Sequence, residues 1–382
     1  MVRKILSIGH SYVVGVNRRL VNEMSRISEG KWEVQAISPT KLKNDFRHFQ
    51  YQSEPTDICK ISTLPVYFDS PIHTMFYDWR IADILKSDWD VVHCWQEPYI
   101  VCGGQVAALT PKTAKLVYYS PQNIDKQYPP PFGWIEKFAT NRMDGLIGVG
   151  ETATKMWQHK LGAELAAKAV TTIPHGIDVD LFKPSPSGRE KVRARCNWPE
   201  DRDPVIGYLG KLTPEKGLPL LIEILDRLAS EGTKWRALIV GTGPLQAELQ
   251  QWAEHYPDRV RIFDDVGHDA VPDYLNAMDL LLAPSQTRPN WCEQLGRMII
   301  EAMACGVPVI ASNSGEIPAV VGAAGIIVAE DDLDAWVKAI QKTIDSPSFR
   351  ADLIAAGMDR VRTKFTWNIV ANQKIAFFES LL

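Results

Sequence analysis

The segment of residues 280–311 constrains the fold of this chain more than any other. A short apolar run at residues 280–283 ends in a polar loop. A helical pattern then begins at about Gly296 and stops at Gly306, before a second apolar run at residues 307–311. Short apolar runs joined through a single helix are typical of parallel strands that are buried on both faces. The segment therefore predicts a strand–helix–strand unit of an α/β protein.

Two carboxylates bracket the start of this helix, Glu293 in the loop and Glu301 in the second turn. Between them, the backbone N–H groups of residues 295–297 have no partners inside the helix, which makes the helix start a natural anion site. In open α/β sheets, ligands bind beyond the carboxyl ends of the strands. The layout suits a ligand that carries phosphate between two hydroxyl-rich groups. The alternative is that Glu293 is a solvated loop residue and that Glu301 merely favours the helix.

The surrounding motif resembles a known family. Glu-x-x-Gly-x-x-x-x-Glu, followed by Ala-Met-Ala-x-Gly-x-Pro-Val-Ile-Ala and Ser-Gly-Glu-Ile-Pro, is similar to the signature of the GT-B retaining glycosyltransferases of family 4 (glycosyl transferases group 1). The resemblance implies that Glu293 contacts the donor sugar, that Glu301 holds the nucleotide ribose, and that loop amides hold the diphosphate. Leu295 stands where the family often has Phe or Tyr, which leaves the backbone donors intact. The donor-binding residues implied for this segment are Glu293, Gln294, Leu295, Gly296 and Glu301.

Two further glycine motifs of the second half resemble the same family. Gly-Lys-Leu-Thr-Pro-Glu-Lys-Gly, which begins at Gly210, is similar to the family's G-R-L-x-x-x-K-G. The resemblance implies that Lys211 and Lys216 hold the donor diphosphate and stabilise charge on the leaving nucleotide. Lys211 replaces the usual Arg, so the charge survives but bidentate geometry is lost; taken alone, both lysines would be read as solvated surface. Gly241 and Gly243 are similar to the family's G-x-G beside the nucleotide.

The first half carries weaker matches. Its first predicted strand runs into a loop where only Gly15 matches the family's glycine-rich, donor-facing turn. A G-x-G-x-x-G motif is missing there, so a dinucleotide redox cofactor is disfavoured. His10 in the same loop is either a site residue or a satisfied polar residue at a strand end. Many family members have a His or a His-Asp pair where this chain has Gln122 and Asn123; Asn123 is kept as a catalytic candidate, although amides cannot titrate near neutral pH.

The resemblance is strongest over residues 174–328, and it implies the GT-B fold. That fold is α/β, with two Rossmann-like, doubly wound domains and a cleft between them. We expect an acceptor-binding domain at residues 1–173, to which a C-terminal helix at residues 366–382 returns, and a nucleotide-sugar domain at residues 174–365. The length of 382 residues suits two domains.

Composition excludes some classes of function. The formal net charge of -4 argues against a nucleic-acid-binding protein. Residues 1–170 hold 20 Lys and Arg against 17 Asp and Glu, a balance of +3 that leaves −7 for the rest. A mildly basic first half could face an acidic acceptor or an anionic membrane, or be a plain solvated surface. Six cysteines without a C-x-x-C pair indicate reduced thiols, and the first 20 residues are too broken by charge for a signal peptide. We therefore expect a cytoplasmic protein, with peripheral membrane contact left open.

The activity implied by the resemblance is a hexosyl transfer with retention of configuration. The donor would be a UDP- or GDP-sugar and the acceptor a hydroxyl of a glycan or lipid-linked molecule, with no cofactor and no metal. The catalytic candidates are Glu293, Lys216, Lys211 and Asn123. Two alternatives stay open: a 2-epimerase or hydrolase of the sugar nucleotide, and a catalytically silent nucleotide-binding subunit that regulates a partner.

Overall fold

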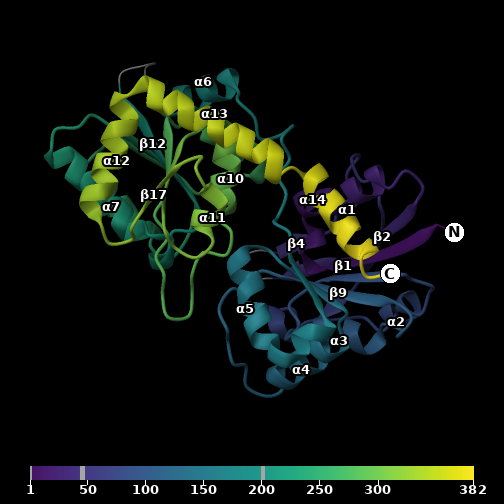
Figure 1. Cartoon of the computed structure of the whole chain (residues 1–382). Coiled ribbons are helices and arrows are strands. Elements are labelled where there is room, and N and C mark those ends of the chain that lie inside the picture. The colour runs from purple at the N-terminus through teal and green to yellow at the C-terminus, as the bar shows by residue number, and fades with distance from the viewer. Residues whose placement is uncertain (1, 44–47, 199–202) are drawn as a thin grey trace. The chain divides into compact units, whose positions relative to one another are not determined.

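The computed structural model describes residues 2–43, 48–198 and 203–382 of the chain (Figure 1). Internal contacts divide the chain into two units. Unit 1 comprises Met1–Gly176 together with Trp367–Leu382, and unit 2 comprises Ile177–Thr366. The sequence placed this boundary three residues earlier, between residues 173 and 174.

Unit 1 is built on a seven-stranded parallel sheet of order β11-β10-β9-β8-β1-β2-β5. The central strands are almost continuously apolar because helices cover both of their faces. In the register of the sheet, Ile5 lies between Val34 on one side and Val91 on the other. The strands are β1 (Arg3–Gly9), β2 (Trp32–Pro39), β5 (Lys60–Leu64), β8 (Val91–Trp95), β9 (Lys115–Ser120), β10 (Gly145–Gly148) and β11 (Ala169–Thr172).

Helices lie on both faces of this sheet, with α1 and α14 on one face and α3 and α4 on the other (Figure 1). Two small antiparallel pairs, β3 with β4 and β6 with β7, stand outside the main sheet. These further elements are η1 (His10–Val13), α1 (Gly15–Ile27), β3 (Lys41–Lys43), β4 (His48–Gln50), β6 (Val66–Tyr67), η2 (Ile72–Thr74), β7 (Phe76–Tyr77), α2 (Ile81–Leu85), α3 (Val101–Leu109), α4 (Phe132–Arg142), α5 (Glu151–Leu161), η3 (Gly162–Ala167) and α14 (Trp367–Glu379).

Unit 2 repeats the architecture with a six-stranded parallel sheet of order β14-β13-β12-β15-β16-β17. The strands are β12 (Val205–Leu209), β13 (Arg236–Val240), β14 (Val260–Phe263), β15 (Leu280–Ala283), β16 (Val309–Ser312) and β17 (Ile326–Val328). The helices are α6 (Pro186–Arg195), η4 (Pro214–Lys216), α7 (Leu218–Ser230), α8 (Gln246–Ala253), η5 (His268–Ala270), α9 (Val271–Asn276), α10 (Arg297–Ala304), α11 (Ile317–Val321), α12 (Leu333–Asp345) and α13 (Pro347–Lys364). The predicted strand–helix–strand unit is confirmed as β15, α10 and β16. Among the described residues, no helix combines the length and the apolar character needed to cross a membrane.

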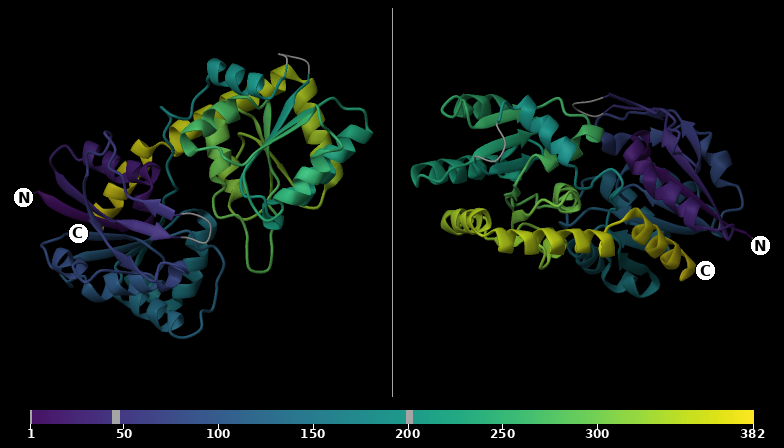
Figure 2. Two further views of the ribbon diagram at one scale, coloured as in Figure 1. Left: turned by 180° about the vertical axis from the view of Figure 1, so that it is seen from behind. Right: turned by 90° about the horizontal axis from the view of Figure 1, so that it is seen from above.

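The C-terminal helix α14 packs in unit 1, as the sequence predicted (Figures 1 and 2). Its anchor is Lys374, which is fully buried although it carries an amine. The amine lies 3.9 Å from the centre of the Tyr119 ring and 3.4 Å from His93 Nε2. Burial lowers the pKa of Lys374 well below its usual value. The amine is thus held by aromatic faces and one imidazole, which compensate a positive charge only in part.

Replacing Lys374 by methionine tests this description of the anchor. Lys374→Met keeps the length of the side chain and removes the buried amine, so we expect the free energy of unfolding at neutral pH to rise by about 1 kcal/mol. The native pKa is lowered, so the wild type gains stability as pH rises toward the unfolded value of about 10.4. The advantage of the variant should therefore shrink as pH rises. Urea unfolding over a pH series measures it, with the exposed Lys60→Met as control; a variant less stable at every pH would contradict the description.

Candidate active site

Three loops of unit 2 meet at one edge of its sheet. They follow β12, β15 and β16, which pair in parallel, so their carboxyl ends share an edge. The loops are residues 210–217, 284–296 and 313–316. They carry most of the donor-binding residues predicted from the sequence.

Glu293 is the centre of this loop cluster. Its side chain is buried, and its Oε2 atom lies 2.6 Å from Lys216 Nζ. Ser285 Oγ donates to the same oxygen at 2.9 Å, and the Gly296 N–H donates to Oε1 at 3.2 Å. The interpretation of Glu293 as a solvated loop residue is therefore wrong. The prediction that the amide of Gly296 is unpaired is also wrong, because Glu293 accepts its hydrogen.

The loop after β16 fixes the backbone of Glu293. The Glu316 N–H donates to the Glu293 carbonyl at 2.9 Å. Gly315 has a φ of 52°, and a Cβ atom there would lie 2.1 Å from that carbonyl oxygen. Only glycine permits this approach, because an L side chain would face both a rare backbone conformation and a clash. The Ser-Gly-Glu motif thus has a packing role: it seats the loop that carries Glu293.

The two predicted lysines are placed differently. Lys216 ends the η4 turn, where its amine pairs with Glu293 and lies 5.1 Å from the centre of the Trp291 ring. Lys211 is exposed, and no carboxylate of the described residues lies within 4.0 Å of its amine. Tyr208 Oη donates to the Lys211 carbonyl at 2.7 Å, which fixes the backbone of this loop. Lys211 therefore offers its charge to a ligand at once, whereas Lys216 must first exchange its carboxylate partner.

The glycine turn after β13 allows close packing against the loop after β12. A Cβ atom on Gly241 would lie 1.8 Å from the Gly210 carbonyl oxygen, and one on Gly243 would lie 2.5 Å from the Leu212 carbonyl oxygen. Both glycines are thus required for the two loops to pack against each other, whether or not a ligand is bound. Their predicted contact with the nucleotide stays a prediction.

Glu301 lies in the second turn of α10 and is buried. Its Oε1 atom is 2.9 Å from Arg297 Nε one turn earlier. Burial raises the pKa of Glu301 to about 7, although the Arg297 charge lowers it. Of its predicted neighbours, Leu295 is buried while Gln294 is exposed. The burial of Glu301 and its ion pair with Arg297 are not explained by helix propensity alone, so the interpretation that Glu301 merely favours the helix is insufficient.

In unit 1, the predicted contact of Gly15 with donor phosphate meets a like charge. Gly15 opens α1, and a Cβ atom there would lie 1.6 Å from Glu54 Oε1. That carboxylate pairs with Arg18 at 3.3 Å. His10, which follows β1, forms a hydrogen bond with the side chain of Gln96, which follows the neighbouring strand β8. Burial lowers the pKa of His10. His10 therefore fits the description of a satisfied polar residue at a strand end.

The loop after β9 carries Gln122 and Asn123. Gln122 is buried: its Nε2 donates to the Ile124 carbonyl at 3.2 Å, and its Oε1 accepts from Tyr128 Oη at 3.3 Å. The amide of Gln122 is thus used within its own loop. Asn123 is half-buried beside it, and its catalytic role stays a prediction.

Glu97 is a residue that the sequence analysis missed. It is half-buried two residues after the end of β8, where Ser120 Oγ donates to its Oε2 at 2.6 Å and the Gln122 N–H donates to its Oε1 at 3.2 Å. Trp157 Nε1 donates to Ser120 Oγ at 2.8 Å, and an indole N–H can only donate. The Ser120 hydroxyl must therefore give its own hydrogen to Glu97. An acid just after a buried strand was the signal in the sequence for this clamp on the Gln122–Asn123 loop.

Glu97→Gln tests the clamp. Above pH 7, where Glu97 is ionised and accepts from both donors, a glutamine turns its NH₂ group toward one of them, so one hydrogen bond is lost and we expect a destabilisation of about 1–3 kcal/mol. Burial raises the pKa of Glu97 to about 7. Its contribution to stability is therefore largest below its unfolded pKa of about 4.3 and falls as pH rises through 7.

The difference between wild type and Glu97→Gln should accordingly shrink between pH 5 and pH 8, flanking the raised pKa of about 7. Denaturant unfolding measures it, with the exposed Glu151→Gln as a matched control that is expected to change stability by less than about 0.5 kcal/mol. A difference that grows with pH would contradict the assignment.

Comparisons with known proteins bear on the family and the fold of the chain. The family model described as Glycosyl transferases group 1 matches residues 189–360, and the model described as Glycosyltransferase Family 4 matches residues 13–181. The 2-deoxystreptamine glucosyltransferase of Streptomyces kanamyceticus is 26% identical over 79% of this chain and 78% of its own length. The lipopolysaccharide core biosynthesis mannosyltransferase LpsB of Rhizobium meliloti is 31% identical over 65% of this chain and 69% of its own length.

A third relative is the GDP-mannose-dependent monoacylated alpha-(1-6)-phosphatidylinositol monomannoside mannosyltransferase of Corynebacterium glutamicum. It is 31% identical over 54% of this chain, and the match spans 55% of its length. Among solved structures, sucrose-phosphate synthase from Thermosynechococcus elongatus superposes with a TM-score of 0.73 at 20% identity over 99% of both chains. Anabaena HepE in complex with UDP and glucose gives a TM-score of 0.72 at 19% identity over 100% of both chains.

Proposed function

The chain belongs to the family 4 glycosyltransferases (glycosyl transferases group 1), and on that premise we propose that it moves a hexosyl unit with retention of configuration. The donor is a UDP- or GDP-sugar, and the acceptor is a hydroxyl of a glycan or lipid-linked molecule. The observation that carries the proposal is the ion pair of the buried Glu293 with the half-buried Lys216 at the carboxyl edge of the unit 2 sheet. HepE forms a complex with UDP and glucose, and the Corynebacterium relative is named as GDP-mannose-dependent. Both support a nucleotide-sugar donor.

Glu293 changes partners when a donor binds. A carboxylate has about four acceptor positions, and Lys216, Ser285 and Gly296 occupy three of them. A pair of neighbouring sugar hydroxyls needs two acceptor positions, so its binding to Glu293 displaces one of these donors. Lys216 is the one that can move, because its stem is flexible and a phosphate offers it a new anionic partner. The amine then stabilises the negative charge that develops on the leaving diphosphate.

Lys211 and the start of α10 supply further positive potential. The charge of Lys211 is exposed beside the same loop, and the first N–H groups of a helix attract anions. Together these groups can perform the electrostatic work that a divalent cation performs in other transferases, which supports a metal-independent reaction. In this scheme no side chain of the protein acts as a general base.

Lys216→Ala tests the exchange. We expect the rate of UDP or GDP release from UDP-glucose or GDP-mannose, with alkyl glycosides as acceptors, to fall about 10²-fold or more. Donor affinity, measured by calorimetry, should change much less, because the charge develops only in the transition state. EDTA should leave the wild-type rate unchanged.

The matched control is Lys234→Ala, an exposed lysine before β13 at the opposite edge of the sheet. Its rate should equal that of the wild type. A Lys216 variant with weakened donor binding and a normal turnover number would contradict the proposed role, and a rate that EDTA abolishes and Mg²⁺ restores would overturn the metal-free scheme.

A further inference from the structure

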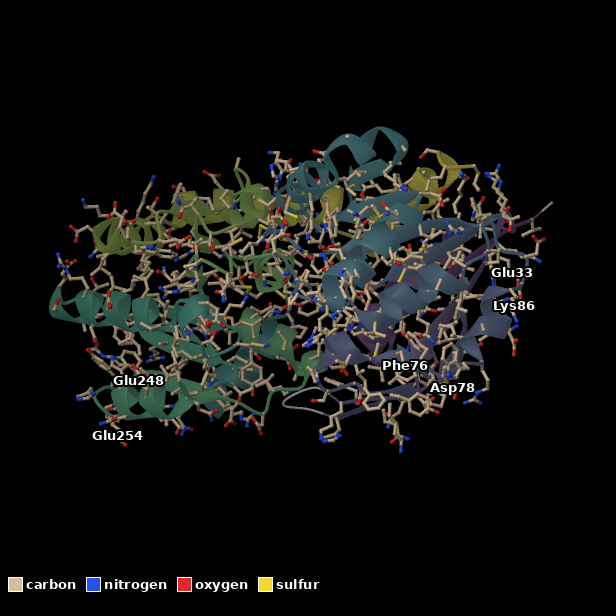
Figure 3. The ribbon with its side chains drawn as sticks, turned by 90° about the horizontal axis from the view of Figure 1, so that it is seen from below. Glu33, Phe76, Asp78, Lys86, Glu248 and Glu254 are labelled. Carbon is tan, nitrogen blue, oxygen red and sulfur yellow. The ribbon has the colours of Figure 1, made fainter. Side chains whose placement is uncertain are left out.

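An apolar groove with a volume of about 550 Å³ lies between α3 and α4 on the outer side of unit 1. Figure 3 looks onto this side of the molecule and labels Phe76 and Asp78 there. The groove is lined without a single charged side chain. Its lining residues are Phe76, Trp79, Val101, Gly104, Gln105, Ala108, Leu109, Pro131, Trp134, Ile135 and Phe138.

Helix α3 explains why the groove is apolar. Its nine residues include no charged side chain, and a helix that is apolar on every side is normally buried on every side. One face of α3, with Cys102 and Val106, is buried in the core. The opposite face, with Val101, Gly104 and Ala108 at one-turn spacing, lines the groove instead. The outer face of α3 therefore lacks the cover that its composition calls for.

Large aromatic side chains project around the groove. Trp79 is 70% exposed, Trp134 is 71% exposed and Phe138 is 50% exposed. Phe68, which is 72% exposed, adds a further ring beside Phe76 at 5.9 Å between centroids. Contiguous exposed apolar patches mark interaction sites, and tryptophan is enriched where an apolar layer meets water.

The segments that flank and include α4, and the segment that follows α3, carry three exposed lysines. Lys112 follows α3, Lys126 precedes α4 and Lys137 lies within α4; all three are exposed. No carboxylate of the described residues lies within 4.0 Å of their amines. Two acids of the neighbouring segment are paired, Asp78 with Arg80 at 2.6 Å and Asp83 with Lys86 at 3.8 Å. A third, Asp69, accepts from the backbone N–H of Lys43 at 2.6 Å.

We propose that this surface docks on an anionic phospholipid bilayer. Trp79, Trp134 and Phe138 enter the interfacial layer, and Lys112, Lys126 and Lys137 lie among the headgroups. Projecting aromatic rings with a rim of unpaired lysines match the two attractions that hold peripheral proteins on anionic membranes.

The inference goes beyond the proposed transfer and does not depend on it, because binding to vesicles is measured without donor or acceptor. The inference also indicates where the acceptor would be found. The relatives include an enzyme named for 2-deoxystreptamine and one named for a phosphatidylinositol monomannoside. A chain that docks through unit 1, the predicted acceptor domain, meets acceptors that reside in the membrane.

Flotation of the full chain with vesicles tests the proposal. Vesicles of phosphatidylcholine mixed with phosphatidylglycerol should carry the chain, and vesicles of phosphatidylcholine alone should carry at least tenfold less. The double variant Trp79→Ser/Trp134→Ser should lose binding at least tenfold while it keeps the wild-type melting temperature. The triple variant Lys112→Gln/Lys126→Gln/Lys137→Gln should lose the salt dependence of binding.

The matched control exchanges the same number of exposed lysines elsewhere in unit 1, as Lys31→Gln/Lys41→Gln/Lys60→Gln, and should bind as the wild type does. The proposal is overturned if the wild type does not float with anionic vesicles, or if the two groove variants bind as the control does. It is also overturned if the tryptophan variant dissociates a dimer of the chain in sedimentation, since the face would then be a protein interface. If the double variant fails to fold, the lysine variants still decide the outcome.

Discussion

The pair of Glu293 and Lys216 is the interaction on which the candidate site depends. It joins the loop after β15 to the loop after β12, with the two charged atoms 2.6 Å apart. The loop after β16 holds the backbone of the same glutamate through the Glu316 N–H. A buried carboxylate left without a partner costs several kcal/mol, so the three loops hold one another in place. The pair holds the loops of the candidate site together, and in the proposed function it is the contact that a donor exchanges, which couples donor binding to the movement of Lys216.

Two other carboxylates, the buried Glu301 and the half-buried Glu97, are compensated less completely. Glu301 has an arginine one turn away, and the hydrogen-bond donors to Glu97 within the described part of the chain are neutral, a hydroxyl and a backbone N–H. Burial raises the pKa of both groups to about 7. Each therefore changes its ionisation near neutral pH. A ligand that donates hydrogen bonds to Glu301 would favour its ionised form and lower this pKa, so a ribose that binds there must make the site depend on pH.

Local patterns predicted the elements better than they predicted the contacts. The helix expected from about Gly296 is α10, whose cap is that glycine in a left-handed conformation, and the flanking apolar runs are β15 and β16. The motifs also identified the fold, because their residues match the family signature in type and in spacing along the strand-end loops. Lys216 and Glu293 are 77 residues apart, and their pairing follows only from strand order.

The Glu97 clamp and the apolar groove were not predicted, because both are formed by residues that are far apart in the sequence. Glu97 accepts from Ser120, and Ser120 accepts from Trp157; the three residues come from separate parts of the sheet and its helices, so no short window of sequence contains these contacts. The groove arises where α3 lies beside α4. Its apolar helix was visible in the sequence, but an exposed face cannot be told from a buried one by composition alone.

The most direct test of the account is calorimetric titration of UDP, GDP and ADP into the wild-type chain and Glu301→Ala, below and above pH 7. The account predicts that the wild type binds one of these nucleotides more tightly above pH 7, where Glu301 is ionised and accepts from the ribose. The alanine variant should bind more weakly at both pH values and with less pH dependence, the titration of the nucleotide being common to both proteins. Equal binding by the variant, or no binding of any nucleotide to the wild type, would contradict the account.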